Sequence, residues 1–156
     1  MHTNRSDSIR HNKCVLGGTF SLLHKGHKYL LSFALKLAKH VVIGITTEEY
    51  LQRHPKRHPV EPFDERALKV LLFCLSISRP GQIVEIVPLS DPYGPSVSDP
   101  DADCIVVSEE TFPAALEINA IRSRRGLKPL EIYAIEMVPS SRGNKPLSSS
   151  ELWLLD

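Results

Sequence analysis

Two histidines, a threonine and two adjacent glycines lie close together in the segment 17–27, which reads G-G-T-F-S-L-L-H-K-G-H. Glycine carries no Cβ, so the backbone there can approach a ligand closely. The amino end of a helix, with its free N–H groups and positive dipole, favours an anion. His24 and His27 are three residues apart and share one side of a first helical turn. With the hydroxyl of Thr19, the two imidazoles are suited to hold a phosphoryl group during its transfer.

These residues need a buried strand before the glycines and a helix after them. The strand is predicted at 13–17, and the helix at 24–39, where apolar residues recur at helical spacing. Residues 40–46 (H-V-V-I-G-I-T) form an apolar run that predicts a second strand, buried on both faces. A strand, helix and strand joined this closely predict a right-handed parallel crossover.

The motif G-G-T-F-x-x-x-H-x-G-H resembles the signature of the HxGH nucleotidyltransferase superfamily, which includes phosphopantetheine, nicotinamide-mononucleotide and FMN adenylyltransferases and small cytidylyltransferases. The resemblance implies that His24 and His27 are catalytic and lie against the nucleotide phosphates. It implies that Thr19 also binds the incoming phosphate of the acceptor. The ATP-binding residues of this motif would be Gly18, Thr19, Phe20 and His27.

Composition places the chain among ordinary globular proteins. The 156 residues fit one domain, predicted at 13–156 after a mobile polar arm at 1–12. A net charge of +1 gives no sign of a nucleic-acid or membrane partner, and the apolar runs are too short to span a bilayer. The arm lacks the apolar stretch of a signal peptide, so we expect a cytoplasmic protein.

The three cysteines each fall in an apolar run, which favours buried reduced thiols over a disulfide. No C-x-x-C pair is present, and we expect no zinc held by the protein's own side chains.

The polar loop predicted at 47–62 leaves the carboxyl end of the second strand, where open α/β sheets bind their ligands. By composition alone, each of its cations is an ordinary surface residue. Members of the superfamily carry a lysine in this loop that reaches the phosphates of both substrates. The resemblance implies that Lys56 is this catalytic and substrate-binding cation, with Arg57 as the alternative because one sequence does not fix the register.

Three more strands are predicted, at 82–87, 104–107 and 130–138. Together with the first two they indicate an α/β protein with a Rossmann-like open parallel five-stranded sheet and helices on both faces, the nucleotidyltransferase fold.

The remaining helices are predicted at 64–78 and from 112 or 113 to Gly126. A leucine stripe should face the core from the first of them, formed by Leu68, Leu71, Leu72 and Leu75.

A second set of motifs, V-S-E-E-T, I-N-A-I-R and G-L-K-P-L-E-I, resembles the archaeal and eukaryotic type of phosphopantetheine adenylyltransferase. This resemblance covers residues 13–152. It implies that Ser108, Asn119 and Arg122 contribute to the ATP site, and that Glu109 contributes to the acceptor site.

The closing segment L-S-S-S-E-L stands where the superfamily has I-S-S-T-R-I, whose hydroxyls and amides hold ATP phosphates. The resemblance therefore implies that Ser148 and Ser149 bind ATP. Glu151 replaces the arginine of that motif and puts a negative charge near a polyphosphate. Either Arg142 or Lys145 compensates, or ATP binding is weaker.

The family resemblance implies the reaction of ATP with 4′-phosphopantetheine to give dephospho-CoA and pyrophosphate, a step of coenzyme A biosynthesis. The attacking phosphate monoester is largely dianionic at neutral pH, so no general base is needed. Mg²⁺ would bridge the phosphates with few protein ligands. The oligomeric state is open, and a homo-oligomer is compatible with the sequence.

Two alternatives remain. One is adenylyl or cytidylyl transfer to another phosphate acceptor, such as FMN or glycerol phosphate. The other is a non-catalytic nucleotide-binding module. It is prompted by Glu151 and by Ser21, which stands where relatives often carry aspartate.

Overall fold

The computed structural model describes residues 9–136 and is built around a parallel sheet of five strands. The strands lie in the order β3-β2-β1-β4-β5. Their bounds are β1 His11–Gly18, β2 Ala38–Thr46, β3 Ile83–Leu89, β4 Cys104–Val107 and β5 Glu131–Ala134. Every neighbouring pair is parallel, which confirms the predicted α/β fold with an open five-stranded parallel sheet.

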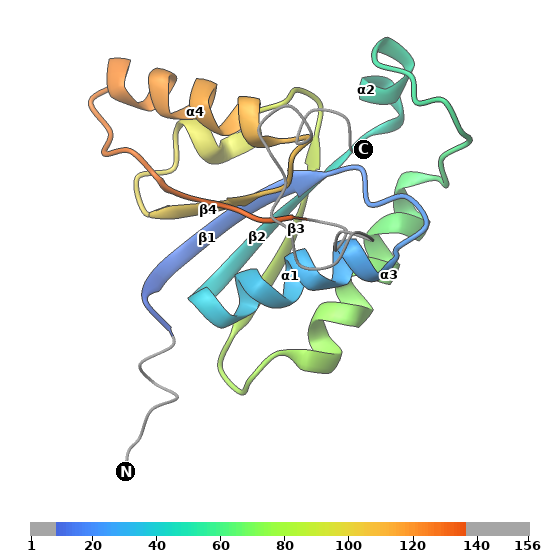
Figure 1. Cartoon of the computed structure of the whole chain (residues 1–156), viewed down its shortest axis with the longest axis horizontal. Coiled ribbons are helices and arrows are strands. Elements are labelled where there is room, and N and C mark those ends of the chain that lie inside the picture. Colours follow the sequence, from blue (N-terminus) through green and yellow to red (C-terminus); the bar gives the residue numbers. More distant parts are fainter. Residues whose placement is uncertain (1–8, 137–156) are drawn as a thin grey trace.

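Helices cover both faces of this sheet (Figure 1). α1 (Lys25–Leu37) and α3 (Phe63–Ile77) pack on one face, and α4 (Phe112–Arg124) packs on the other. β2 serves both cores, because its side chains alternate between the faces: Val41 and Ile43 point to the α1 side and Val42 to the α4 side. None of the helices within residues 9–136 is long and apolar enough to cross a membrane.

A short helix, α2 (Glu48–Arg53), lies in the segment that was expected to be a loop only. Thr47 caps it by accepting a hydrogen bond from the amide of Tyr50 at 3.1 Å. Glu48 and Glu49 occupy its first turn, where acidic residues complement the helix dipole. None of its residues is buried, so it has no apolar stripe and hydrophobic periodicity could not reveal it.

The leucine stripe predicted for α3 is wrong. Leu68, Leu72 and Leu75 are 54–58% exposed, and the buried positions of this helix are Arg66, Val70 and Cys74. These three residues also recur at helical spacing, but a stripe that begins with an arginine reads as a surface face. The fully buried Arg66 is the reason for the difference, and its contacts belong to the site described below.

Several element boundaries also differ from the predictions. β1 begins at His11, so the last two residues of the expected arm belong to the sheet. The carboxylate of Asp103 holds the start of this strand by accepting from the amides of Asn12 (3.0 Å) and Lys13 (3.2 Å). α1 ends at Leu37, because Ala38 is already extended and begins β2. The proline-rich segment after β3 contains one turn of 3₁₀ helix, η2 (Gly94–Val97).

Candidate active site

A cleft lies at the carboxyl ends of the parallel strands and contains two adjoining cavities. The larger measures about 310 Å³ and the smaller about 210 Å³. Six residues line both of them: Gly17, Gly18, Thr19, Lys56, Glu110 and Thr111. The cleft can therefore hold two molecules that meet at one wall, which is the arrangement that transfer of a group between two substrates requires.

The two motif histidines lie in the smaller cavity, at the amino end of α1. His24 caps the helix: its Nδ1 accepts from the amide of Gly26 at 3.1 Å. Nδ1 of His27 accepts in turn from the backbone amide of His24 at 3.2 Å, so each histidine supports the other. This reciprocal arrangement is a capping box built from imidazoles instead of a serine and a glutamate.

The capping contacts decide where each ring carries its proton. An imidazole nitrogen that accepts a hydrogen bond holds no proton, so the proton of each ring lies on Nε2. The rings are stacked with centroids 3.8 Å apart and an interplanar angle of 24°. The ring of Phe20, 5.4 Å from that of His27, packs against the pair. The helix start thus presents two oriented N–H donors together with its backbone amides, a suitable environment for phosphate oxygens.

The turn between β1 and α1 carries two residues in the left-handed region, Phe20 (φ 55°) and Leu22 (φ 51°). Such conformations are strained for side chains of this kind and need support from neighbouring groups. Glu61 supplies it by accepting from the hydroxyl of Ser21 and from the amide of Leu22, both at 2.9 Å. Ser21 is therefore a donor to a carboxylate, whereas an aspartate in its place would face Glu61 as a like charge.

Glu61 links this turn to the pH dependence of stability. Its burial alone would raise the pKa of the carboxyl. Hydrogen bonds from its own amide, from Leu22 and from Ser21, with the charge of Lys69, outweigh burial and hold the pKa below its ordinary value. The stabilisation is therefore present above the unfolded-state pKa and is lost as the pH falls through the lower, folded-state value.

We expect Glu61→Gln to lower the free energy of unfolding at pH 7 by about 1–2 kcal/mol, because a charged acceptor of two hydrogen bonds is lost. We also expect the variant to lose less stability than the parent when the pH is lowered below the ordinary glutamate range. Urea unfolding across pH 3–7 measures both effects, with the half-exposed Glu65→Gln as the matched control. Parallel pH curves for parent and Glu61→Gln would contradict the assignment.

Arg66 lies on α3 and supports the segment that carries Thr19. It was not among the predicted site residues. Its guanidinium donates to the carbonyls of Glu61 (2.7 Å) and Thr19 (3.0 Å) and to the hydroxyl of Thr46 (3.3 Å). Thr46 donates in turn to the hydroxyl of Thr19 at 3.2 Å. Arg66 thus fixes the backbone and side chain of Thr19, where the two cavities meet. Arg66 could have been recognised in the sequence as a charged residue at helical spacing from Val70 and Cys74, which are buried.

The loop after α2 places Lys56 and Arg57 differently. Lys56 lines both cavities and forms an ion pair with Glu110. Arg57 is exposed and lines neither cavity. The register that the sequence left open therefore favours Lys56 as the loop cation. Glu110, which sequence reasoning missed, directly follows the predicted Glu109.

The two residues directly after β4 also differ from each other. Ser108 lines the smaller cavity, and its amide donates to the hydroxyl of Thr111 at 3.1 Å. Glu109, expected in the acceptor site, is only 1% exposed and lines neither cavity. Since β4 is buried on both faces, the chain leaving it still passes through the core at Glu109.

Asn119 and Arg122 lie on α4 away from both cavities, which differs from the expected place in the ATP site. Asn119 forms a pair of hydrogen bonds with the backbone of Leu130, 2.8 Å from its N–H and 3.0 Å from its carbonyl. Arg122 is fully buried and donates to four carbonyls, those of Ser96, Asp99, Ala102 and Lys128. Both side chains hold loops against α4, and spacing alone could not distinguish this from a ligand-facing role.

We therefore expect Asn119→Ala to affect stability and not nucleotide binding. The change leaves two backbone groups of Leu130 without their partners, which should lower the free energy of unfolding by about 1–3 kcal/mol. The KM for ATP should stay within twofold of the parent. Asn119→Asp keeps the oxygen acceptor, so its free energy of unfolding should lie between those of the parent and Asn119→Ala. A raised KM for ATP with an unchanged melting temperature would return Asn119 to the nucleotide site.

The larger cavity has a mainly apolar wall that the sequence did not reveal. It is contributed by the four strands β1–β4 and by α4, and includes Val42, Val87, Leu89, Val107 and Ile118. Asp91 shapes its rim by accepting from the amides of Tyr93 and Gly94, both at 2.8 Å. Such a wall suits an uncharged, extended organic chain. Ser148 and Ser149, the remaining predicted ATP ligands, lie outside the described residues.

Comparisons with known proteins agree with this geometry. A model of the cytidylyltransferase-like family matches residues 15–153. Phosphopantetheine adenylyltransferase of Methanopyrus kandleri is 48% identical over 92% of this chain and 89% of its own length. The enzyme of the same name from Methanosarcina acetivorans is 41% identical over 90% of this chain and 88% of its own length.

A solved structure has the same fold. The crystal structure of a protein with unknown function from Archaeoglobus fulgidus matches with a TM-score of 0.72 at 37% identity, over 83% of this chain and 93% of that one. The chain belongs to the cytidylyltransferase-like family and, within it, to the phosphopantetheine adenylyltransferases.

Proposed function

We propose that this chain transfers the adenylyl group of ATP to 4′-phosphopantetheine, which yields dephospho-CoA and pyrophosphate. The observation that carries the proposal is the pair of cavities that meet at Thr19 and Lys56, one with the two histidines at a helix start and one with a mainly apolar wall. The curated relatives, which are named for this activity, support the choice of substrates.

Each cavity suits one substrate. The smaller one holds the helix start, His24 and His27, and suits the triphosphate of ATP. The larger one, with its apolar wall, suits the uncharged pantetheine arm, whose terminal phosphate would reach the shared wall beside Thr19. The phosphate of the acceptor would then lie next to the α-phosphate of ATP, as an in-line displacement requires.

In the reaction, an oxygen of the acceptor phosphate forms a bond to the α-phosphorus, and the bond from this phosphorus to the bridging oxygen of pyrophosphate breaks. The attacking phosphate is already largely deprotonated at neutral pH, so the site needs no general base. Catalysis then consists of positioning and of stabilising the negative charge that develops on the transferred and leaving groups.

Four side chains would contact different phosphate groups of the two substrates. The Nε2–H groups of His24 and His27 would donate to phosphate oxygens of ATP, with His27 acting on the transferred group. The hydroxyl of Thr19, oriented through Thr46 and Arg66, would hold the acceptor phosphate. Lys56 reaches both cavities and would stabilise the shared charge.

Mg²⁺ fits this site as an ion that enters with ATP. The wall shared by the cavities offers oxygen donors, the hydroxyls of Thr19 and Thr111 and the carboxylate of Glu110, which already pairs with Lys56. Mg²⁺ prefers oxygen ligands and keeps several waters, so such a sparse set is sufficient. Glu110 and Thr111 would hold the ion, with phosphate oxygens and waters in the rest of its shell. When bound, the ion neutralises phosphate charge.

The test is pyrophosphate release from each combination of ATP or CTP with 4′-phosphopantetheine, FMN or glycerol phosphate. We expect release with ATP and 4′-phosphopantetheine, at least 100-fold faster in kcat/KM than with any other pair. Faster release with another acceptor or with CTP would assign a different transfer reaction. ATP binding in calorimetry, without release from any pair, would identify a non-catalytic nucleotide-binding module.

A further inference from the structure

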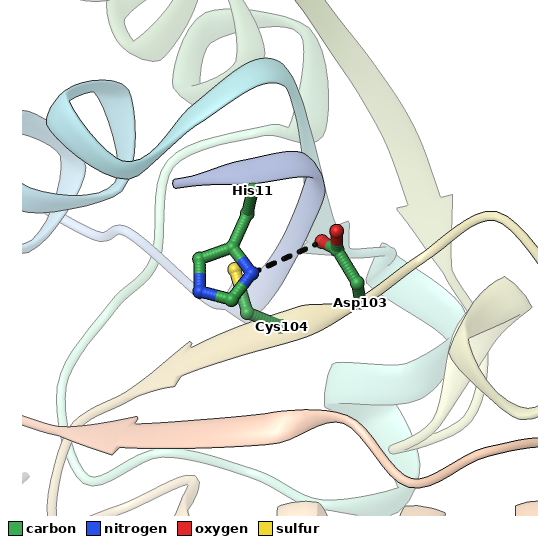
Figure 2. A group of neighbouring side chains, drawn as sticks. All are labelled: His11, Asp103 and Cys104. Atoms are coloured by element: carbon green, nitrogen blue, oxygen red, sulfur yellow. Dashed lines mark ion pairs between the residues drawn. The ribbon is translucent and has the colours of Figure 1, made fainter. Parts of the chain in front are cut away.

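A second group of side chains with metal-binding chemistry lies at the opposite end of the sheet from the cleft. Figure 2 shows His11, Asp103 and Cys104 pointing toward one another from the beginnings of β1 and β4. One ligand atom from each residue, an imidazole nitrogen, a carboxylate oxygen and a sulfur, lies within 4.8 Å of the other two. The proposed reaction uses none of these residues.

We propose that His11, Asp103 and Cys104 form a binding site for one Zn²⁺ or a similar divalent transition-metal ion. Nitrogen, carboxylate oxygen and thiolate sulfur are the ligand types that Zn²⁺ takes in proteins. Tetrahedral geometry with the usual bond lengths places two ligand atoms about 3.3–3.5 Å apart. Nδ1 of His11 and Oδ1 of Asp103 are already 3.5 Å apart, and the sulfur of Cys104 lies within 4.8 Å of the nitrogen and oxygen ligand atoms.

The surroundings of the three ligands resemble the outer contacts of metal sites. A metal-binding histidine usually has its second nitrogen held by a carboxylate or another polar group. Here Nε2 of His11 lies 2.9 Å from the hydroxyl of Tyr133 and 3.4 Å from Oε1 of Glu131, which leaves Nδ1 toward Asp103 and Cys104. The carboxylate of Asp103 is held in turn by two amides of β1.

The third ligand lies beside a second cysteine on the neighbouring strand. Cys14 and Cys104 are register partners on β1 and β4, so their side chains share one face of the sheet. The thiol of Cys14 donates to the carbonyl of Val15 at 3.7 Å and is fully buried, so the face that carries the Cys104 ligand is closed to solvent on that side.

Solvent can reach the site from one side. The side chains of His11 and Asp103 are 11% and 23% exposed, whereas Cys104 is fully buried. An ion can enter past the carboxylate, and a water can complete its coordination. The bound ion would join the starts of β1 and β4 beside β5. The missing C-x-x-C motif had led us to expect no zinc site, but these ligands come from strands about ninety residues apart.

The test is a titration of chelator-treated protein with Co²⁺, a spectroscopic substitute for Zn²⁺, under a non-thiol reductant. We expect one equivalent to bind per chain, with the charge-transfer absorption of a cobalt–thiolate bond, and Zn²⁺ to displace it. His11→Gln should weaken binding at least 100-fold. His40→Gln is the matched control, because it removes a histidine that pairs with Glu85 at 2.9 Å on the neighbouring strand, and it should bind as the parent does.

A melting experiment gives an independent measurement in case Cys104→Ala does not fold. One equivalent of Zn²⁺ should raise the melting temperature of the parent and of His40→Gln, but not that of His11→Gln. Three results would overturn the site: a cobalt spectrum without the thiolate band, equal affinity in His11→Gln and the parent, or binding that is lost only when His24 or His27 is replaced.

Discussion

Replacing His27 by asparagine is expected to lower turnover about 10²–10³-fold while the protein keeps its melting temperature. The fall is the usual effect of removing one preorganised donor to developing charge. The asparagine oxygen can take the place of Nδ1 and accept from the amide of His24, so the helix cap remains. The Nε2–H proposed to donate to the phosphate is lost, together with the ring contacts to His24 and Phe20. Pyrophosphate release measured beside a melting curve separates the two functions of this ring.

His27→Gln is the complementary variant. Its longer amide can place a donor near the position of Nε2 but cannot cap the helix in the same way. We expect it to recover part of the turnover and to lose about 1 kcal/mol of stability, the usual effect of a lost cap. Parent-like turnover in folded His27→Asn would refute the role of His27 as a donor in the reaction.

Replacing Lys56 by methionine is expected to lower turnover about 10²–10³-fold, because the change removes a positive charge that lines both cavities. Methionine keeps the apolar stem of the side chain. Stability should change little, since the ion pair with Glu110 is partly open to solvent, and such pairs contribute about 0–1 kcal/mol. Single-turnover measurements at saturating ATP and 4′-phosphopantetheine give the effect on the chemical step.

Arg57→Met is the matched control for Lys56→Met. It removes the same charge from the adjacent residue, which is exposed and lines neither cavity. We expect its turnover to remain within twofold of the parent. An equal loss of turnover in both variants would mean that catalysis depends on the total positive charge of the loop. The specific placement of Lys56 would then have no role.

The place of the loop after β2 could be predicted from the sequence, but its catalytic cation could not. Topology indicated that this loop borders the cleft, because the carboxyl ends of parallel strands meet at one edge of the sheet. The sequence could not distinguish Lys56 from Arg57, since adjacent loop residues have no periodicity that orients them. The tertiary structure resolves the choice, because Lys56 lines both cavities and Arg57 lines neither.

Two buried arginines explain two of the differences between prediction and structure. Arg66 and Arg122 are both fully buried, and most of their hydrogen bonds go to backbone carbonyls. A carbonyl is present at every residue and leaves no mark in the sequence. For this reason the leucines of α3 were assigned to the core in place of Arg66, and Arg122 was assigned to the ligand.

The sequence by itself determined the strands, most of the helices and the pair of histidines, because these depend on interactions between residues a few positions apart. His24 and His27 cap one helix turn, so their spacing alone brings their rings together. Only the tertiary structure decided which side chains meet across the sheet. The order β3-β2-β1-β4-β5 places β1 beside β4, which brings Thr19 near Glu110 at one end and His11 near Cys104 at the other. Such contacts depend on strand order and register, which no local pattern specifies.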